Sequence, residues 1–376
     1  MKLSGLYTQQ HTNLDPDLHL QESINWLKRA QDSGTDRGVS YGTRFGQKFQ
    51  PSYPETTGYI ICTFLELSRT LKIPEYFDRA IEMGLWEIAV QMESGAVMGG
   101  QVNRNPSPAV FNTGQVLLGW ASLYRATGDE RFARAGERAC AWLMSVQEPN
   151  GHWIRGNSNY AAKGATLYNV KAAWGLGEMA QAIGSNEGVQ AAVRNAEYTQ
   201  AQQTENGWFP NCCLSDPERP LLHTIAYTMQ GLMGIGLLSG RQDFIASAGR
   251  MADQLLRLMD AQGFIPGRIN RSMAGTVSWC CLTGTAQTSI VWSQLYERTG
   301  LEKYREAVQR ANRYLMARHD IANPDPAIRG GLAGSWPVWG GYCPFMIPNW
   351  ATKFFVDALL AEQRITAPTT AGRINA

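Results

Sequence analysis

The chain has 376 residues, of which 44% are hydrophobic and 18% are charged, so it has enough apolar material for a large core and is not a disordered protein. Its 34 basic residues nearly balance its 32 acidic ones, and the net charge of +2 gives no basic footprint for nucleic acid. The sequence contains neither an apolar run of the roughly 20 residues that a membrane helix needs nor the apolar stretch of a secretion signal near its N-terminus. We therefore expect a cytoplasmic protein with no nucleic-acid or membrane partner, and we leave its oligomeric state open.

One pattern recurs along the chain at intervals of 56 to 60 residues. It consists of an aromatic residue or leucine, a short apolar stretch, a glutamine and then a turn with glycine. Because a fixed period of this length is typical of repeated structural units, each copy should form the same supersecondary element. In chain order, the glutamine position is occupied by Gln31, Gln91, Gln147, Gln203, Gln262 and, in a degenerate sixth copy, His319.

Each period contains two predicted helices. The helix before the glutamine is amphipathic, as in residues 130–147, where Phe132 and Trp142 follow helical spacing and charged residues cover the other side. The helix after it is apolar on nearly every side and rich in small residues, as in 112–127 and 223–240. A helix without a polar face is buried on all sides, so the sequence predicts six inner helices surrounded by six outer ones.

This alternation predicts an all-α protein with the architecture of an (α/α)6 toroid. We expect one domain over residues 1–364 and a flexible tail over 365–376. The links from outer to inner helices are long and those from inner to outer helices are short, so all long loops should emerge at one end of the toroid. Loops held by a rigid scaffold commonly carry function, and we expect the site at that end. The long loops span residues 33–54, 94–111, 149–166, 205–221, 261–282 and 319–347.

The segment ACAWLMSVQEPNGHW, residues 139–153, resembles the glutamine-tryptophan repeat of triterpene cyclases and, more loosely, of protein prenyltransferase β subunits. The toroid architecture is similar to that of six-hairpin glycosidases, polysaccharide lyases and sugar epimerases. The chain lacks the Asp-rich motif of the cyclases and an Asp-x-Cys that would match the zinc ligands of the prenyltransferases. The resemblance therefore implies the α/α toroid superfamily and favours a carbohydrate-active enzyme. An isoprenoid cyclase- or prenyltransferase-like enzyme is the alternative.

Glu55 is the one carboxylate that the sequence places at the first turns of the inner helices. It is a candidate general acid or base. Hydrolysis of a glycosidic bond normally uses two carboxylates, so the second would have to come from the long loops. The alternative is structural, because a negative charge at a helix start is favoured by the helix dipole.

His223 and Tyr227 form the other candidate catalytic pair, because residues four apart share one face of a helix. A neutral histidine can remove the proton next to a uronate carboxylate, and a tyrosine hydroxyl can protonate the leaving oxygen or the opposite ring face. The resemblance to toroid lyases and C5-epimerases implies this chemistry. Hydrolysis, β-elimination and uronyl C5-epimerisation therefore remain open, and so does a toroid that binds glycans without turnover.

Further polar and aromatic residues near the same end could bind an oligo- or polysaccharide by hydrogen bonding, by pairing with a carboxylate, or by stacking on a sugar ring. Helix capping or core packing is the alternative for each of them. The candidates are Tyr53, Asn112, Tyr168, Asn169, Trp208, Arg268, Arg271, Trp336, Trp339, Tyr342, Asn349, Trp350 and Lys353. The arginines favour a substrate that contains uronic acid units.

The seven cysteines show no CxxC spacing, and in a cytoplasmic protein they should stay reduced. We expect no cofactor. A zinc ion bound by Cys280, Cys281, Cys343 and His223 is the alternative, because these residues map to the same end of the predicted toroid. Otherwise the cysteines pack as small apolar side chains.

Overall fold

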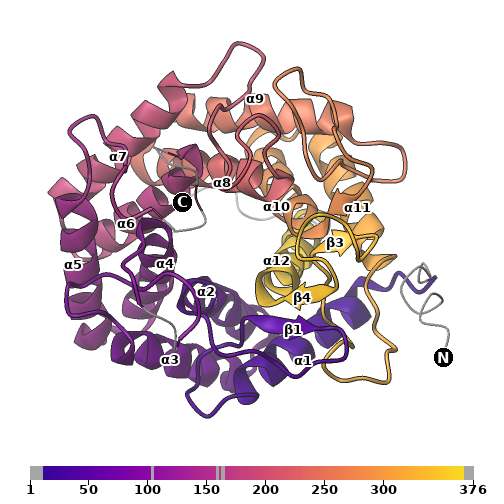
Figure 1. Ribbon diagram of the computed structural model, residues 1–376, viewed down its shortest axis with the longest axis horizontal. Helices are drawn as coiled ribbons and strands as arrows, with labels where there is room; N and C mark the ends of the chain where they lie inside the picture. Colours follow the sequence, from indigo (N-terminus) through magenta and orange to yellow (C-terminus); the bar gives the residue numbers. More distant parts are fainter. Residues whose placement is uncertain (1–11, 103–105, 158–160, 162–165, 368–376) are drawn as a thin grey trace.

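The computed structural model describes residues 12–102, 106–157, 161 and 166–367, which form two concentric rings of helices (Figure 1). This arrangement confirms the predicted all-α (α/α)6 toroid. The inner ring consists of α2 (Pro54–Leu71), α4 (Val110–Thr127), α6 (Val170–Ala182), α8 (Leu222–Ser239), α10 (Leu282–Thr299) and α12 (Asn349–Thr366). The outer ring consists of α1 (Pro16–Asp32), α3 (Pro74–Ala89), α5 (Glu130–Ser145), α7 (Asn186–Ala201), α9 (Gln242–Leu258) and α11 (Glu302–Met316).

The ring closes where the two ends of the chain meet. Each inner helix packs against the next, and α12 packs against α2. The outer helix α1 covers α12, so this helix pair is formed from opposite ends of the sequence. His319, which replaces the glutamine in the sixth copy of the repeat, lies at this junction with its Nδ1 atom 2.8 Å from Nδ1 of His19 in α1.

Small residues let the inner helices approach one another closely. A Cβ atom on Gly175 of α6 would lie 1.8 Å from the carbonyl oxygen of Gly114 in α4. A Cβ on Gly284 of α10 would lie 2.6 Å from the backbone nitrogen of His223 in α8. Neither position has room for a larger side chain, so the small residues of the predicted inner helices determine how tightly the ring packs.

The repeat glutamines connect neighbouring outer helices. Gln91, Gln147 and Gln203 each donate from Nε2 to the glycine carbonyl four residues later, at 2.8–2.9 Å, and to a carbonyl in the next outer helix, at 2.9–3.0 Å. Gln262 differs from this pattern, because it lies four residues beyond the end of α9 and is exposed, whereas these three glutamines lie two residues beyond their helices. The sequence period is therefore maintained at this position without the hydrogen-bonding role.

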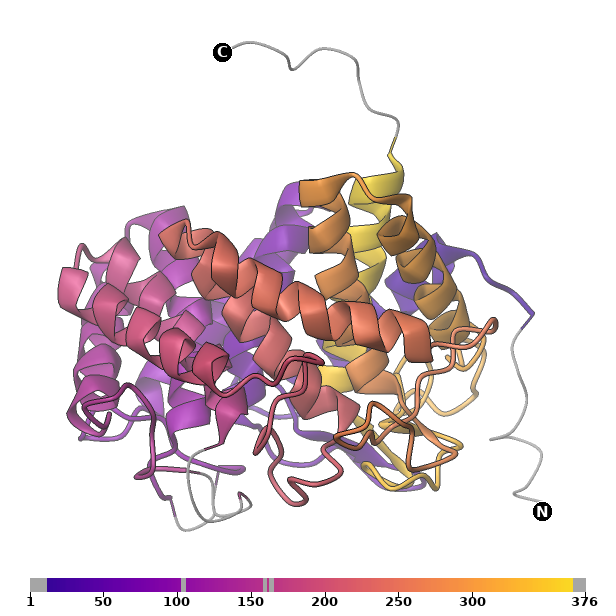
Figure 2. The ribbon, with the colours of Figure 1, turned by 90° about the horizontal axis from the view of Figure 1, so that it is seen from above.

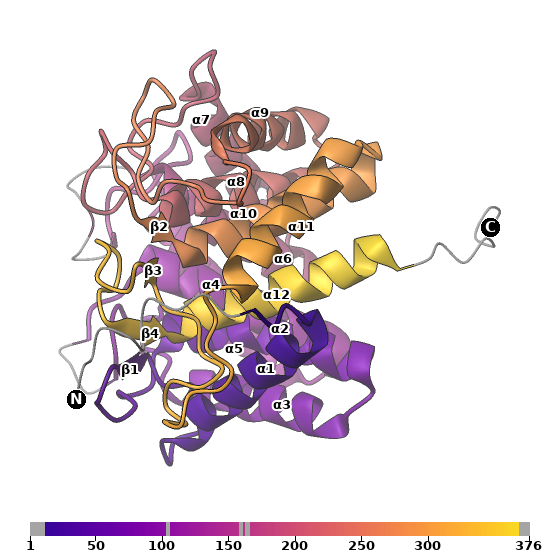
Figure 3. The ribbon, with the colours of Figure 1, turned by 90° about the vertical axis from the view of Figure 1, so that its right-hand side faces the viewer.

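The long loops gather at one end of the toroid, along the lower edge of Figure 2 and at the left of Figure 3. Two short antiparallel ribbons organise them. In the first, β1 (Gly42–Arg44) pairs with β4 (Met346–Pro348), with Thr43 opposite Ile347. In the second, β2 (Cys280–Cys281) pairs with β3 (Ser335–Trp336). Separately, a short 3-10 turn, η2 (Leu167–Asn169), precedes α6.

The C-terminal helix α12 continues to Thr366, two residues into the predicted tail, and residues 368–376 lie outside the described part of the chain. Among the helices of residues 12–367 that the structure describes, none combines the length and the apolar character that crossing a membrane requires.

Candidate functional site

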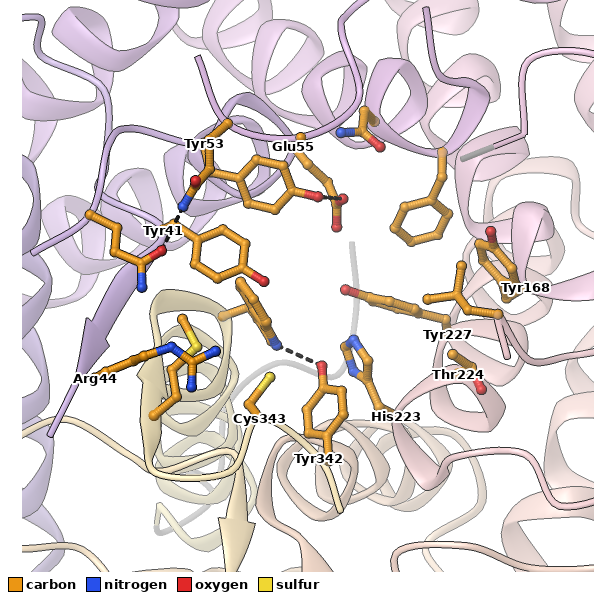
Figure 4. Close-up of a pocket in the computed structure, with 18 residues that line it drawn as sticks. Tyr41, Arg44, Tyr53, Glu55, Tyr168, His223, Thr224, Tyr227, Tyr342 and Cys343 are labelled. Atoms are coloured by element: carbon orange, nitrogen blue, oxygen red, sulfur yellow. Dashed lines mark hydrogen bonds between the residues drawn. The ribbon is translucent and has the colours of Figure 1, made fainter. Parts of the chain in front are cut away.

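A cavity of about 600 Å³, which we call the front cavity, lies at the long-loop end of the inner ring (Figure 4). Its walls come from the first turns of α2, α4, α8 and α12 and from the loops around them. The residues that line it are Tyr41, Arg44, Gln50, Tyr53, Glu55, Gly100, Gln101, Phe111, Asn112, Tyr168, Leu214, His223, Thr224, Tyr227, Tyr342, Cys343, Met346 and Trp350. The end of the toroid where we expected a site thus contains a cavity large enough for a small ligand.

Aromatic rings form much of the wall of the front cavity. The ring of Tyr41 lies edge-on to Trp350, with their centroids 4.8 Å apart, and 5.1 Å from the ring of Tyr53. On the opposite wall, Tyr227 contacts Phe111 at 4.8 Å. Such walls present flat apolar faces with polar hydroxyl and indole groups at their edges.

Glu55 lies in the first turn of α2 and faces the front cavity (Figure 4). Tyr53, the residue just before this helix, donates a hydrogen bond from its hydroxyl to Oε2 of Glu55 at 2.5 Å. Removal from bulk water raises the pKa of the Glu55 carboxyl to about 7, although the hydrogen bond from Tyr53 and the nearby Lys171 both act to lower it. Glu55 can therefore hold or release a proton near neutral pH.

His223 lies across the front cavity from Glu55, in the first turn of α8 (Figure 4). Its Nδ1 is 2.7 Å from Oε1 of Gln287 in α10. The Nε2 of Gln287 donates to Oε1 of Gln230 at 3.4 Å, and Lys171 donates to that same oxygen at 2.5 Å. Since this network presents the carbonyl oxygen of Gln287 to His223, we assign the imidazole proton to Nδ1 and the lone pair to Nε2.

Desolvation, with Lys171 nearby, lowers the pKa of His223 to about 3. The imidazole is therefore neutral near pH 7 and is suited to accept a hydrogen bond through Nε2. Tyr227 lies on the same helix face as expected from its spacing, with its ring centroid 4.3 Å from that of His223. Burial raises the pKa of the Tyr227 hydroxyl well above its usual value, so it stays protonated.

The structure brings together many of the predicted site residues. All three catalytic candidates line the front cavity, and so do five of the binding candidates, Tyr53, Asn112, Tyr168, Tyr342 and Trp350. Asn112 is held in place by its Nδ2, which donates to the carbonyl of Met98 at 3.0 Å. Tyr342 accepts a hydrogen bond from the indole of Trp350 at 2.7 Å.

Other first-turn candidates face neighbouring segments instead of the front cavity. Asn169 donates to Oδ1 of Asn157 at 2.7 Å, and Asn349 donates to the carbonyl of Ser40 and to Oγ1 of Thr56, both at 2.7 Å. Both asparagines are buried, and they join loops to the inner ring rather than reach toward a ligand. Neither side chain caps its helix, so their role is to tie these segments together rather than the helix capping considered as the alternative.

The remaining binding candidates lie away from the front cavity for different reasons. Trp208 is buried in the core, and Lys353 points along α12 to Asp357 at 2.5 Å. Arg268 donates to the carbonyl of Arg219 at 2.6 Å. Arg271 and Trp339 are exposed, and Trp336 is half-buried in β3.

Several lining residues were not anticipated, and the most distinctive is Arg44, the cation of the front cavity among its described lining residues. Arg44 belongs to β1, which pairs with β4 about 300 residues later in the chain. Tyr41, in the first long loop, and Thr224, beside His223 in the first turn of α8, also line the cavity. A pairing between such distant segments leaves no local signal in the sequence.

Desolvation keeps the cysteines considered for zinc protonated, and among them Cys343 is half-buried. Cys280 and Cys281 form β2 and are fully buried, and Sγ of Cys280 lies 3.2 Å from Oγ1 of Thr285. Burial raises the pKa of Cys343 to about 12, so it is a thiol rather than a thiolate. Across residues 12–102, 106–157, 161 and 166–367, no three His, Cys, Asp or Glu side chains are grouped so that they could hold a metal ion.

Comparison by sequence finds no matching protein-family model and no matching curated protein. Comparison by structure finds many similar folds. An unsaturated glucuronyl hydrolase specific for heparin is 14% identical, with a TM-score of 0.75, and the match covers 93% of this chain and 98% of that one.

These structural matches share the (α/α)6 toroid fold of this chain. A D-mannose isomerase matches with a TM-score of 0.72 at 11% identity, over 93% of this chain and 97% of the other. The cellobiose 2-epimerase of Bacillus thermoamylovorans B4167 matches with a TM-score of 0.71 at 12% identity, over 92% and 98%. At such low identity the likeness establishes the toroid fold, and the chemistry has to be argued from the site itself.

Proposed function

We propose that this protein is a carbohydrate-active enzyme that removes the terminal uronic acid from an unsaturated oligosaccharide, with Glu55 as the proton donor. One observation carries the proposal: a carboxyl group with a pKa of about 7 faces a cavity walled by aromatic rings. A proton donor is most effective when its pKa lies near the working pH. Glu55 meets that condition at neutral pH.

A sugar is the ligand class that best suits the walls of the front cavity. Tyrosine and tryptophan rings can stack on the apolar faces of a sugar, while polar groups such as Asn112 and Nε2 of His223 can bond its hydroxyls. The volume of about 600 Å³ suits roughly one or two sugar rings. The three toroid proteins described above act, by their names, on glucuronyl groups or simple sugars, which supports the same substrate class here.

The charged residues that line the front cavity favour one reaction, the hydrolysis of an unsaturated uronic acid. Among its described lining residues Glu55 is the one carboxylate, whereas ordinary glycoside hydrolysis uses two. An unsaturated uronic acid needs only one proton donor, because its double bond and ring oxygen form an enol ether that can be protonated on carbon. Arg44 supplies a positive charge that can pair with the uronate carboxylate.

The step requires only the protein, the substrate and one water molecule. Glu55 transfers its proton to C4, which leaves positive charge shared by C5 and the ring oxygen. Water adds to C5 and returns a proton to the Glu55 carboxylate. The resulting hemiketal opens to a ketone, and the hemiacetal left at C1 releases the rest of the saccharide as an alcohol.

The test is to incubate the protein with unsaturated oligosaccharides made by lyase digestion of acidic polysaccharides. We expect loss of the ultraviolet absorbance of the double bond and incorporation of one heavy oxygen from labelled water. Glu55→Gln should lower the rate at least about 100-fold with unchanged folding. The control is Glu130→Gln, on the exposed side of α5, which should keep full activity. Full activity in Glu55→Gln would exclude Glu55 as the donor.

A second candidate is epimerisation or isomerisation of a sugar, and the observation that favours it is the lone pair on Nε2 of His223 across the cavity from Glu55. Glu55 could remove a proton from a sugar carbon and return it, while Nε2 of His223 accepts a hydrogen bond from a hydroxyl of the same sugar. In deuterated water, this reaction would label an uncleaved saccharide with carbon-bound deuterium. The absence of cleavage together with such labelling would replace the first proposal by the second.

A further inference from the structure

A second cavity, of about 340 Å³, lies farther along the inner ring from the long loops, and we call it the rear chamber. Its lining residues come later in their helices than those of the front cavity: in α12, for example, Trp350 lines the front cavity and Asp357 the rear chamber. In Figure 3, α12 runs away from the long loops in that direction. Every inner helix contributes to the chamber, through Tyr59, Leu118, Lys171, Gln230, Ile290 and Phe354 among others.

Four charged residues of the rear chamber form two ion pairs. Arg125 donates to Oε2 of Glu178 at 2.7 Å and to the carbonyl of Glu178 at 2.8 Å. Lys353 donates to Oδ2 of Asp357 at 2.5 Å, and Oδ1 of Asp357 accepts from Thr63 at 2.8 Å. Both carboxylates are therefore already compensated by partners of their own.

Lys171 is a fifth ionisable residue of the rear chamber and belongs to neither pair. Only 3% of its surface is exposed. Among the described residues, its ammonium has one hydrogen bond, to the neutral Oε1 of Gln230. Its other neighbours include the rings of Tyr227 and Phe354, whose centroids lie 4.7 and 4.8 Å from Nζ. An ammonium has three donors, so Lys171 has bonding capacity that these contacts leave unused.

The second lysine of the chamber, Lys353, shares an aromatic neighbour with the first. Nζ of Lys353 is 4.3 Å from the centroid of the same Phe354 ring, and Lys353 is also nearly fully buried. Burial, together with the positive charge of Lys353, lowers the pKa of Lys171 well below its usual value. A bound anion would accept from the unused donors and stabilise the protonated form of Lys171.

We propose that the rear chamber binds a compact oxyanion, such as phosphate or the carboxylate of a small organic acid, through the amino groups of Lys171 and Lys353. The proposal does not depend on the reaction assigned to the front cavity. It assigns a ligand class to a cavity farther along the inner ring, where the two cations and two anions of the ion pairs leave one cation in excess when Lys171 is protonated.

The test is isothermal titration calorimetry of the full chain with phosphate and with acetate in separate experiments, at an ionic strength held constant with chloride. We expect saturable binding of one oxyanion, and the tighter of the two identifies its chemical source. Lys171→Met should weaken binding at least tenfold, because it removes the uncompensated cation and keeps an apolar stem. Asp357→Asn should strengthen binding, because it frees Lys353 from its partner.

A second pair of variants keeps the proposal testable if a lysine substitution disturbs folding. Ser122, half-buried in the wall of the chamber, can be changed to Asp, which adds a repelling negative charge, and to Asn, which has a similar shape without it. Of these two variants, only Ser122→Asp should lose binding of the oxyanion. Arg44→Gln tests for binding in the front cavity and should bind as the unmodified protein does. No saturable binding, or binding lost in Arg44→Gln and kept in Lys171→Met, would overturn the proposal.

Discussion

The two ends of the inner ring are built from the same helices but differ in how their ionisable side chains are partnered. In the front cavity, Glu55 and His223 are ionisable groups whose environment favours the neutral form of each. In the rear chamber, Arg125 with Glu178 and Lys353 with Asp357 are ion pairs with short hydrogen bonds. The first arrangement keeps groups available for proton transfer, and the second fixes charges in place.

The difference follows from what surrounds each end. The front cavity is enclosed by long loops and aromatic rings, which remove water from Glu55 without placing a cation in direct contact with it. The rear chamber lies among the side chains of the inner helices, where opposite charges are three or four residues apart or on neighbouring helices. The same scaffold can therefore hold a reactive site at one end and a charge-paired region at the other.

The largest effect on stability is expected from breaking an ion pair at the rear. Asp357→Asn leaves Lys353 buried without its carboxylate and should lower the free energy of unfolding by about 3 kcal/mol, measured by urea denaturation at pH 7. The control is Glu302→Gln, which breaks an exposed pair with Arg305 and should cost about 1 kcal/mol or less. Equal losses in the two variants would mean that the rear pair is no more than a surface interaction.

The shifted pKa values of Glu55 and His223 in the front cavity should make the free energy of unfolding depend on pH. The raised pKa of Glu55 stabilises the fold below pH about 4.5, and this contribution is lost as the pH rises toward 7. The lowered pKa of His223 works in reverse, because its contribution is present above pH 6.5 and is lost as the pH falls toward 3. Between about pH 4.5 and 6.5 the two effects oppose each other.

Single variants separate these two effects. Relative to the unmodified protein, Glu55→Gln should make the free energy of unfolding rise more steeply with pH over that window, by up to about 1.4 kcal/mol per pH unit. His223→Gln should change the slope of the free energy of unfolding against pH by a similar amount in the opposite direction, so that stability falls more steeply with rising pH than in the unmodified protein. Urea denaturation at several pH values measures both, and slopes of the same sign would contradict the assigned shifts.

A smaller effect is expected at the glutamine positions that support the front end. Gln147→Leu removes two hydrogen bonds to backbone carbonyls and should cost about 1–2 kcal/mol. It should also raise amide hydrogen exchange in residues 149–157 and leave the rear-chamber residues unchanged. Gln262→Leu is the matched control and should change stability by less than about 0.5 kcal/mol, because this glutamine is exposed. A uniform rise in exchange would mean that the glutamine stabilises the whole ring.

Patterns along the chain were sufficient to predict the fold and the end that holds the front cavity. Helical spacing in residues 130–147 and the apolar surface of residues 223–240 reflect burial, which is recorded locally in the sequence. The four-residue spacing of His223 and Tyr227 correctly placed them on one face. Gln262 is the exception, since it keeps the period and has left the helix end where the hydrogen bonds are made.

The sequence by itself thus determined the number and burial of the helices and the neighbourhood of the site, because a helix repeats its own geometry every few residues. Only the tertiary structure decided that Glu55 faces the front cavity while Asn349 faces Ser40 and Thr56. It also decided that Arg44 joins the site through a strand pairing and that Lys171 lies in the rear chamber outside both of its ion pairs. These outcomes depend on how each helix is rotated and on contacts between residues far apart in the chain, and a local pattern records neither.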